Sequence, residues 1–172
     1  MIGRPTAALA SWLILCSFAD SSVRYQGRYV NKDYGFEVTI PPGYVGIGAA
    51  LSAPNHGFLL KTRDGAMVSV VANYDTVQSP SGESFEQQMM RANGPPAANL
   101  GGLKAWASAK RRVERGRHRF EKGIVARRVS QDGDAIIYSI SEDAQEEAHG
   151  AADRLFEKVV DSFRVMPVDS KQ

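Results

Sequence analysis

The sequence predicts an α+β fold in which helices cover an antiparallel sheet. Apolar and polar residues alternate in several short runs that turn signals separate, which is the pattern of strands joined by hairpins. The chain then closes on a long amphipathic stripe with helical spacing. Because a sheet and an amphipathic helix each have an apolar face to bury, we expect the helices to pack on the sheet.

The composition indicates one globular domain. Apolar residues make up 43% of the 172 residues and charged residues 23%, a balance that excludes disorder over the whole length. A chain of this size buries roughly two-thirds of its unfolded surface, so it needs neither a metal nor a disulfide to fold. The formal net charge of +2 is too small to indicate a nucleic-acid partner.

Residues 1–19 are typical of a secretory signal peptide. Arg4 supplies a short basic region, Ala7–Leu15 an apolar run, and Ser17 and Ala19 the small residues at positions −3 and −1 of a cleavage site. The apolar run is too short to span a membrane, which takes about 20 residues. We therefore expect an exported protein, periplasmic or secreted, without a membrane span. The alternative for this segment is a buried N-terminal helix.

Cys16 is the only cysteine in the sequence. Cleavage after Ala19 would leave a mature chain without disulfides, thiol catalysis or Cys-based metal sites. In the alternative, Cys16 becomes the lipid-anchored N-terminus of a bacterial lipoprotein, with Leu13 as the leading residue of that motif.

We expect the mature chain to comprise a flexible lead-in over 20–27, a single α+β domain over 28–166 and a tail over 167–172. Tyr34–Ile40 alternates between the two faces of a strand and ends at Pro41, which lacks the N–H that a ladder needs. Residues 44–56 are expected to form a loop with room for one short strand.

Two sets of hairpin strands follow. Gly57–Arg63 and Ala66–Tyr74 flank Asp64-Gly65, the strongest short hairpin signal because such turns need positive φ. Strand-like runs then cover 103–113, 117–129 and 134–141, with turns at 114–116 and 131–133.

Two helices are expected. The first covers about Glu83–Ala92 and ends at the stop signal Gly94-Pro95. The second covers about Asp143–Phe163, with an apolar stripe at helical spacing. Acidic residues at 142–147 are placed at the start of this second helix, where the helix dipole favours negative charge.

Two segments resemble a known family. Tyr29–Tyr44, with its Gly-Phe strand followed by Pro and an aromatic residue, resembles the opening of Mog1/PsbP-like domains. Leu155–Arg164, which ends in Ser-Phe-Arg, is similar to their closing helix. The resemblance covers 28–166 and implies about six antiparallel strands between helices. The group includes photosystem accessory proteins, a Ran-binding protein, mycobacterial lipoproteins and exported bacterial proteins of unassigned role. It is mostly non-enzymatic, and it offers no shared catalytic motif.

The sequence contains no nucleophile elbow, P-loop, dinucleotide fingerprint or His-Glu-x-x-His motif. His56, His118 and His149 are far apart in sequence, so we expect no metal and no cofactor. His56 is the candidate loop site because it lies between Pro54 and Gly57, just before a strand. The alternative is a turn residue that caps backbone groups.

The strongest charge feature is a basic hairpin. It is concentrated at the turn at 114–116, where both faces meet solvent, and Lys110 and Arg112 share one face while Arg111 lies on the other. An anionic partner in the envelope would fit it: lipid headgroups, an acidic glycan or an acidic protein surface. The alternative is a solvated hairpin whose charge prevents edge aggregation, with the carboxylates at 142–147 neutralising the tip. The residues expected to contact an anionic partner are Lys110, Arg112, Arg115, Arg117 and Arg119.

The first functional hypothesis is therefore an exported, non-catalytic accessory or binding domain that acts through a contact surface. The second is an immunity-type protein that neutralises a secreted effector. The third is an envelope hydrolase that uses His56 with nearby carboxylates, for which Asp75 and Tyr44 are the candidate partners.

Overall fold

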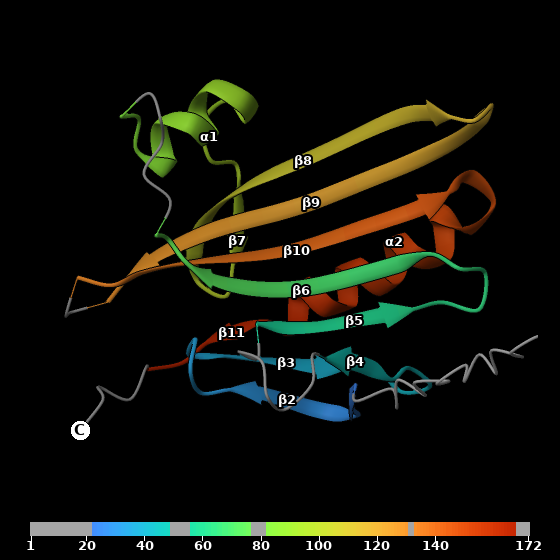
Figure 1. Cartoon of the computed structure of the whole chain (residues 1–172), viewed down its shortest axis with the longest axis horizontal. Coiled ribbons are helices and arrows are strands. Elements are labelled where there is room, and N and C mark those ends of the chain that lie inside the picture. Colours follow the sequence, from blue (N-terminus) through green and yellow to red (C-terminus); the bar gives the residue numbers. More distant parts are fainter. Residues whose placement is uncertain (1–21, 49–55, 77–81, 131–132, 168–172) are drawn as a thin grey trace, which may run out of the picture.

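The computed structural model describes residues 22–48, 56–76, 82–130 and 133–167. Within these ranges the chain forms two antiparallel sheets and two helices (Figure 1). The expected signal peptide over 1–19, with Cys16, lies outside the described residues, as does the tail from 168 onward.

The large sheet has eight strands in the order β1-β4-β5-β6-β10-β9-β8-β7. The small sheet has three, in the order β11-β3-β2. The bounds of the large sheet are β1 Val23–Tyr25, β4 Gly46–Gly48, β5 Gly57–Lys61, β6 Met67–Tyr74, β7 Ala98–Leu100, β8 Leu103–Glu114, β9 Arg117–Val129 and β10 Ala135–Gln145. The small sheet consists of β2 Gly27–Asn31, β3 Phe36–Ile40 and β11 Arg164–Val165, and the helices are α1 Phe85–Asn93 and α2 Glu146–Ser162.

The expectation of a single sheet of about six strands is wrong, although the α+β class and the antiparallel pairing are confirmed. Strands β1 and β7 have three residues each, too few for alternation to be recognised in the sequence, whereas β4 is the short strand expected within 44–56. β1 lies inside the segment 20–27, so the expected flexible lead-in contains a strand that pairs with β4.

The last helix begins later than expected. β10 continues to Gln145 because it pairs with β9 over its whole length, and Asp143 lies opposite both Met67 of β6 and Glu121 of β9. Of the acidic run, Glu146 and Glu147 form the first turn of α2, as expected. Glu142 and Asp143 are strand residues instead, because pairing on both sides of β10 outweighs the favourable dipole at a helix start.

The core lies between the large sheet, α2 and the small sheet. The apolar stripe of α2 is buried against β10, β9, β6 and β3. Three aromatic rings join the layers: Phe163 stacks on Phe36 at 5.4 Å between ring centroids and meets Tyr138 edge-on at 5.5 Å. The Tyr138 hydroxyl donates a hydrogen bond to the backbone oxygen of Tyr34 at 2.7 Å, which satisfies the buried polar group.

The other face of the large sheet, here called the outer face, carries α1 at one end (Figure 1). Phe85 of α1 meets Trp106 of β8 edge-on at 5.8 Å. The expected helix over 83–92 is confirmed: Ser84 and Gln87 form a capping box at its start, and Gly94 caps its end. The apolar contact and the caps hold α1 where β8 begins.

β8 and β9 form a long hairpin (Figure 1), and the buried residues of β8 lie near its start. β10 pairs with β9 as far as Arg119, so the last residues of the hairpin have no neighbouring strand beyond β9. The turn residues Arg115 and Gly116 have φ of 50° and 76°, which is the geometry of the primed turns favoured in two-residue hairpins. The predicted strands over 103–113 and 117–129 are confirmed.

Candidate functional site

His56 is held by two protein oxygens. Its Nδ1 lies 2.9 Å from the Tyr34 hydroxyl and 3.0 Å from the backbone oxygen of Ala72. Asp75, considered as its carboxylate partner, is instead bonded to Arg127. His56 lines neither of the two cavities described below. These contacts connect His56 to Tyr34 and to the backbone of β6.

The basic residues of the hairpin lie on the faces that alternation predicts. In the register of β8 and β9, Lys110 is opposite Glu121 and Arg112 is opposite Arg119, and all four point to the outer face. Arg111 is opposite Phe120 on the face that α2 covers.

Carboxylates neutralise most of the cations on the outer face. Glu121 binds both Lys110 at 2.8 Å and Arg112 at 2.7 Å. Arg119 makes two hydrogen bonds to Asp143, at 3.0 Å and 2.6 Å, and these bonds raise the pKa of its guanidinium. Because these three cations already have carboxylate partners, they attract an anionic ligand more weakly than unpaired cations would.

The positive charge at the turn of the hairpin is not neutralised in this way. In the part of the chain that the structure describes, neither Arg115 nor Arg117 lies within 4.0 Å of a carboxylate. Arg117 reaches only the neutral Gln145, at 3.5 Å between Nη1 and Oε1. A cavity of about 630 Å³ lies beside Arg117. It is lined by Asp64, Arg117, Gln145, Glu147 and Ala148. The net positive charge of the hairpin is therefore concentrated at its tip.

A buried carboxylate and a histidine connect β10 to α2. Glu142 is 1% exposed, and its Oε1 lies 2.9 Å from Nδ1 of His149. Its Oε2 has no hydrogen-bond partner among the described residues. Burial raises the pKa of Glu142, although the hydrogen bond from His149 acts in the opposite direction.

His149 stacks on Phe120 of β9 at 4.2 Å between centroids, with the rings 8° from parallel. The guanidinium of Arg111 lies 5.3 Å from the centre of the same Phe120 ring and bonds Glu146 at 2.7 Å. These contacts make an aromatic and cationic layer between the hairpin and the first two turns of α2.

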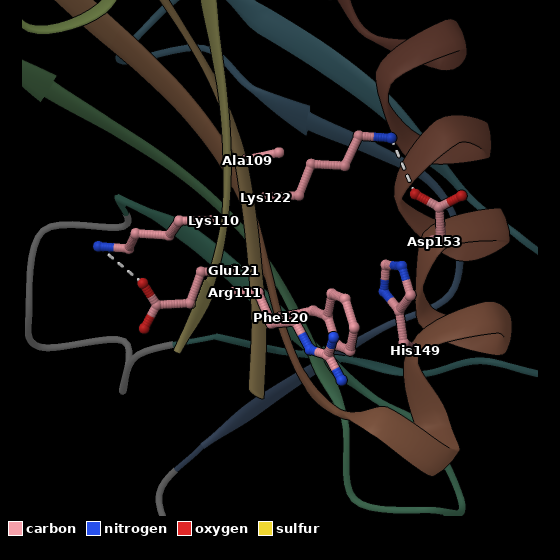
Figure 2. Close-up of a pocket in the computed structure, with 8 residues that line it drawn as sticks. All are labelled: Ala109, Lys110, Arg111, Phe120, Glu121, Lys122, His149 and Asp153. Carbon is pink, nitrogen blue, oxygen red and sulfur yellow. Dashed lines mark hydrogen bonds and ion pairs between the residues drawn. The ribbon is translucent and has the colours of Figure 1, made fainter. Parts of the chain in front are cut away.

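A cavity of about 380 Å³ opens beside this layer (Figure 2). Figure 2 shows Lys122 reaching across it to Asp153, with a separation of 2.8 Å, while Lys110 and Glu121 point to the other side of the sheet. Lys122 also pairs with Glu157. The cavity is lined by Ala109, Lys110, Arg111, Phe120, Glu121, Lys122, His149 and Asp153.

The sequence indicated the hairpin but not this cavity. Its lining comes from β8, β9 and α2, and their proximity depends on the register of two strand pairs. One signal was available: Glu142 occupies an apolar position in the alternation of Ile136, Tyr138 and Ile140, which predicts a buried charge in need of a partner.

In the described ranges, no group of three or more His, Cys, Asp or Glu side chains could hold a metal ion. None of the helices in these ranges is both long and apolar enough to cross a bilayer.

The fold and this site define an α+β sandwich with a projecting charged hairpin. Similar solved structures include LpqN of Mycobacterium tuberculosis, described as involved in cell envelope biogenesis, with 14% identity, a TM-score of 0.58 and coverage of 84% of this chain and 92% of that chain. A protein from Bacteroides thetaiotaomicron has 13% identity and a TM-score of 0.55, and the match covers 86% of this chain but only 51% of that one.

PsbP of the cyanobacterium Synechocystis is also found, with 18% identity, a TM-score of 0.37 and coverage of 85% of this chain and 93% of that chain. No protein-family model and no curated protein matches the sequence. At these identities the likeness concerns the fold alone. The chain therefore shares the fold of LpqN and of the Bacteroides protein, and this fold agrees with the resemblance carried by 29–44 and 155–164.

Proposed function

We propose that this chain is an exported, non-catalytic binding domain of the cell envelope that contacts its partner through the β8–β9 hairpin. The observation that carries the proposal is the contrast within the hairpin. Lys110, Arg112 and Arg119 are occupied by carboxylates, whereas Arg115 and Arg117 at the exposed turn are not, in the part of the chain described.

The partner is expected to be anionic. Positive charge at a projecting turn raises the local concentration of an acidic surface and speeds association. The fold supports an envelope role, since LpqN, described as involved in cell envelope biogenesis, shares it over 92% of its length.

Export rests on the signal peptide that residues 1–19 indicate. Mass spectrometry of the mature N-terminus tests it. A chain that begins at Asp20 supports signal cleavage, whereas a diacylglyceryl group on Cys16 would make the protein a tethered lipoprotein. A full-length chain in the cytoplasm would contradict the proposal.

Affinity capture tests the contact surface. The chain from Asp20 onward is immobilised and exposed to an envelope extract from its source organism, and the experiment is repeated with the double variant Arg115→Glu/Arg117→Glu. The matched control reverses two exposed charges outside the hairpin, with Lys32→Glu/Lys158→Glu. We expect the hairpin variant to retain about tenfold less partner than the control. Equal retention by both variants would contradict the proposal.

A further inference from the structure

β8 is almost an edge strand. β7 pairs with it only over Leu103–Ala105, where Ala98 lies opposite Ala105. β9 pairs with one edge of β8 as far as Glu114. Beyond Ala105, no described strand pairs with the opposite edge. An extended stretch of backbone therefore has one free side.

The two turns that flank β8 fix which residues face this free side. Each is a two-residue turn: Gly101-Gly102 joins the pair Leu100 and Leu103, and Arg115-Gly116 joins the pair Glu114 and Arg117. The residues next to such a turn form a hydrogen-bonded pair, and bonded and non-bonded pairs then alternate along the ladder.

Counting from either turn gives the same result. From the tip, Glu114, Arg112, Lys110 and Ser108 direct their backbone groups toward β9. From the other end, Leu103 and Ala105 direct theirs toward β7. The residues whose backbone N–H and C=O groups point outward from the unpaired stretch are Ala107, Ala109, Arg111 and Val113.

The side chains leave these groups accessible. All residues over 107–114 are exposed, and Val113 has 64% of its surface accessible. Ala107 and Ala109 carry only a methyl group each, so they do not cover the backbone. An exposed edge of this kind is a template for one further strand.

The cavity lies along the same edge. Ala109 and Arg111, which offer free backbone groups, also line the cavity of about 380 Å³ beside Phe120 and His149. Because alternate side chains of an added strand point to the same face, one of them would enter this cavity. The Phe120 ring supplies an apolar wall for it.

Charge indicates what kind of strand fits. The free edge runs to the turn, where Arg115 and Arg117 have no carboxylate partner among the described residues, so an incoming strand meets uncompensated positive charge at that end. A second copy of this chain that paired antiparallel about Arg111 would place Lys110 opposite Arg112, and like charges directly opposite are destabilising. An acidic strand is complementary.

We infer that an extended acidic segment of a partner protein adds to the free edge of β8 as a further strand and inserts one apolar side chain into the cavity between the hairpin and α2. This inference rests on the proposed function, since it specifies how the hairpin makes its contact. The backbone ladder would supply affinity, and the cavity would supply selectivity.

The test uses a capped heptapeptide that alternates Glu with Val or Phe. The control peptide has the same side chains but carries methyl groups on alternate backbone nitrogens, which removes the ladder while preserving the charge. The protein variant Ala109→Pro removes an outward N–H, a position where an edge strand tolerates proline. Ala109→Ser keeps both the N–H and the small side chain, and thermal unfolding verifies that both variants fold.

We expect the peptide to protect the amides of Ala107, Ala109, Arg111 and Val113 from hydrogen exchange. We also expect Ala109→Pro, but not Ala109→Ser, to weaken peptide binding about tenfold. The N-methylated peptide should bind the parent protein no more tightly than the unmodified peptide binds Ala109→Pro. Equal binding by Pro and Ser variants, equal binding of both peptides, or no binding at all would overturn the inference. Concentration-dependent dimerisation through the β8 edge would overturn it too, in favour of a second copy.

The failure of this inference can be told apart from the failure of the proposed function. If Arg115→Glu/Arg117→Glu loses the envelope partner while Ala109→Pro retains it, the hairpin is the contact surface but strand addition is wrong. If neither variant loses the partner, the proposed function itself fails.

Discussion

The two ends of the β8–β9 hairpin differ although one continuous ladder connects them. At the inner end, Ala105 and Ala126 are opposite each other and fully buried. At the outer end, Val113 and His118 are opposite each other and exposed. Backbone pairing is common to both ends, so the difference comes from what covers the faces. We conclude that burial in the main core supplies stability at the inner end, whereas the side chains at the outer end stay accessible to solvent.

The largest effect is expected in the aromatic centre. Phe163 is 1% exposed and contacts Phe36 and Tyr138. Truncation by Phe163→Ala should lower the free energy of unfolding by about 3–5 kcal/mol, because it removes apolar burial and leaves a cavity between the layers. Urea denaturation measures this, and a loss below about 1 kcal/mol would mean that the three rings do not form the core.

Glu142→Gln should change how stability depends on pH. Burial raises the pKa of Glu142 in the folded state. The folded state therefore holds this proton more tightly than the unfolded state, and the stabilisation present below the unfolded pKa is lost as the pH rises through the folded pKa. Gln cannot ionise and does not incur this loss.

The measurement compares urea denaturation of both proteins in steps from pH 4 to pH 8. The stability of the Gln variant relative to the parent should increase with pH, and His149→Gln alone should not reproduce the trend. A relative stability that falls with pH would show that the bond to His149 outweighs burial at Glu142.

Arg119→Ala should lower the free energy of unfolding by less than Phe163→Ala and by more than the double variant at Arg115 and Arg117. The side chains of Arg119 and Asp143 are 25% and 32% exposed, so solvent screens their bidentate pair. A double-mutant cycle with Asp143→Asn should give a coupling of about 0.5–1 kcal/mol, smaller at high salt. A coupling above about 2 kcal/mol would show that the hairpin depends on this pair for its structure.

Arg115→Glu/Arg117→Glu should have the smallest effect on folding. Both side chains are exposed, so the free energy of unfolding should change by less than about 0.5 kcal/mol. Urea denaturation beside the Lys32→Glu/Lys158→Glu control measures the change. A larger loss would place structural contacts at the tip, and reduced partner capture could then no longer be attributed to charge alone.

Local signals in the sequence predicted the long strands and their turns. Asp64-Gly65 and the turn before Arg117 place the two main hairpins, because a positive φ leaves few residue types suitable. Strands β1 and β7 could not be predicted, because three residues show no period and their pairing is with distant or flanking segments.

Local sequence signals predicted only part of the candidate site. Alternation placed Lys110, Arg111 and Arg112 on their correct faces. It could not show that Glu121 and Asp143 neutralise most of the patch, since those contacts require the register of three strands. The sequence also could not show that one edge of β8 is unpaired, because edge status depends on the order of strands in the folded sheet.

Hydrogen exchange of the free protein measures whether the edge of β8 opposite β9 is unpaired. We predict alternating protection along β8 at the outer end of the hairpin. The amides of Ser108, Lys110 and Arg112 should exchange at least about tenfold more slowly, relative to their intrinsic rates, than those of Ala107, Ala109 and Arg111. Equal protection of both sets in the monomer would contradict it, because the edge of β8 would then already be covered.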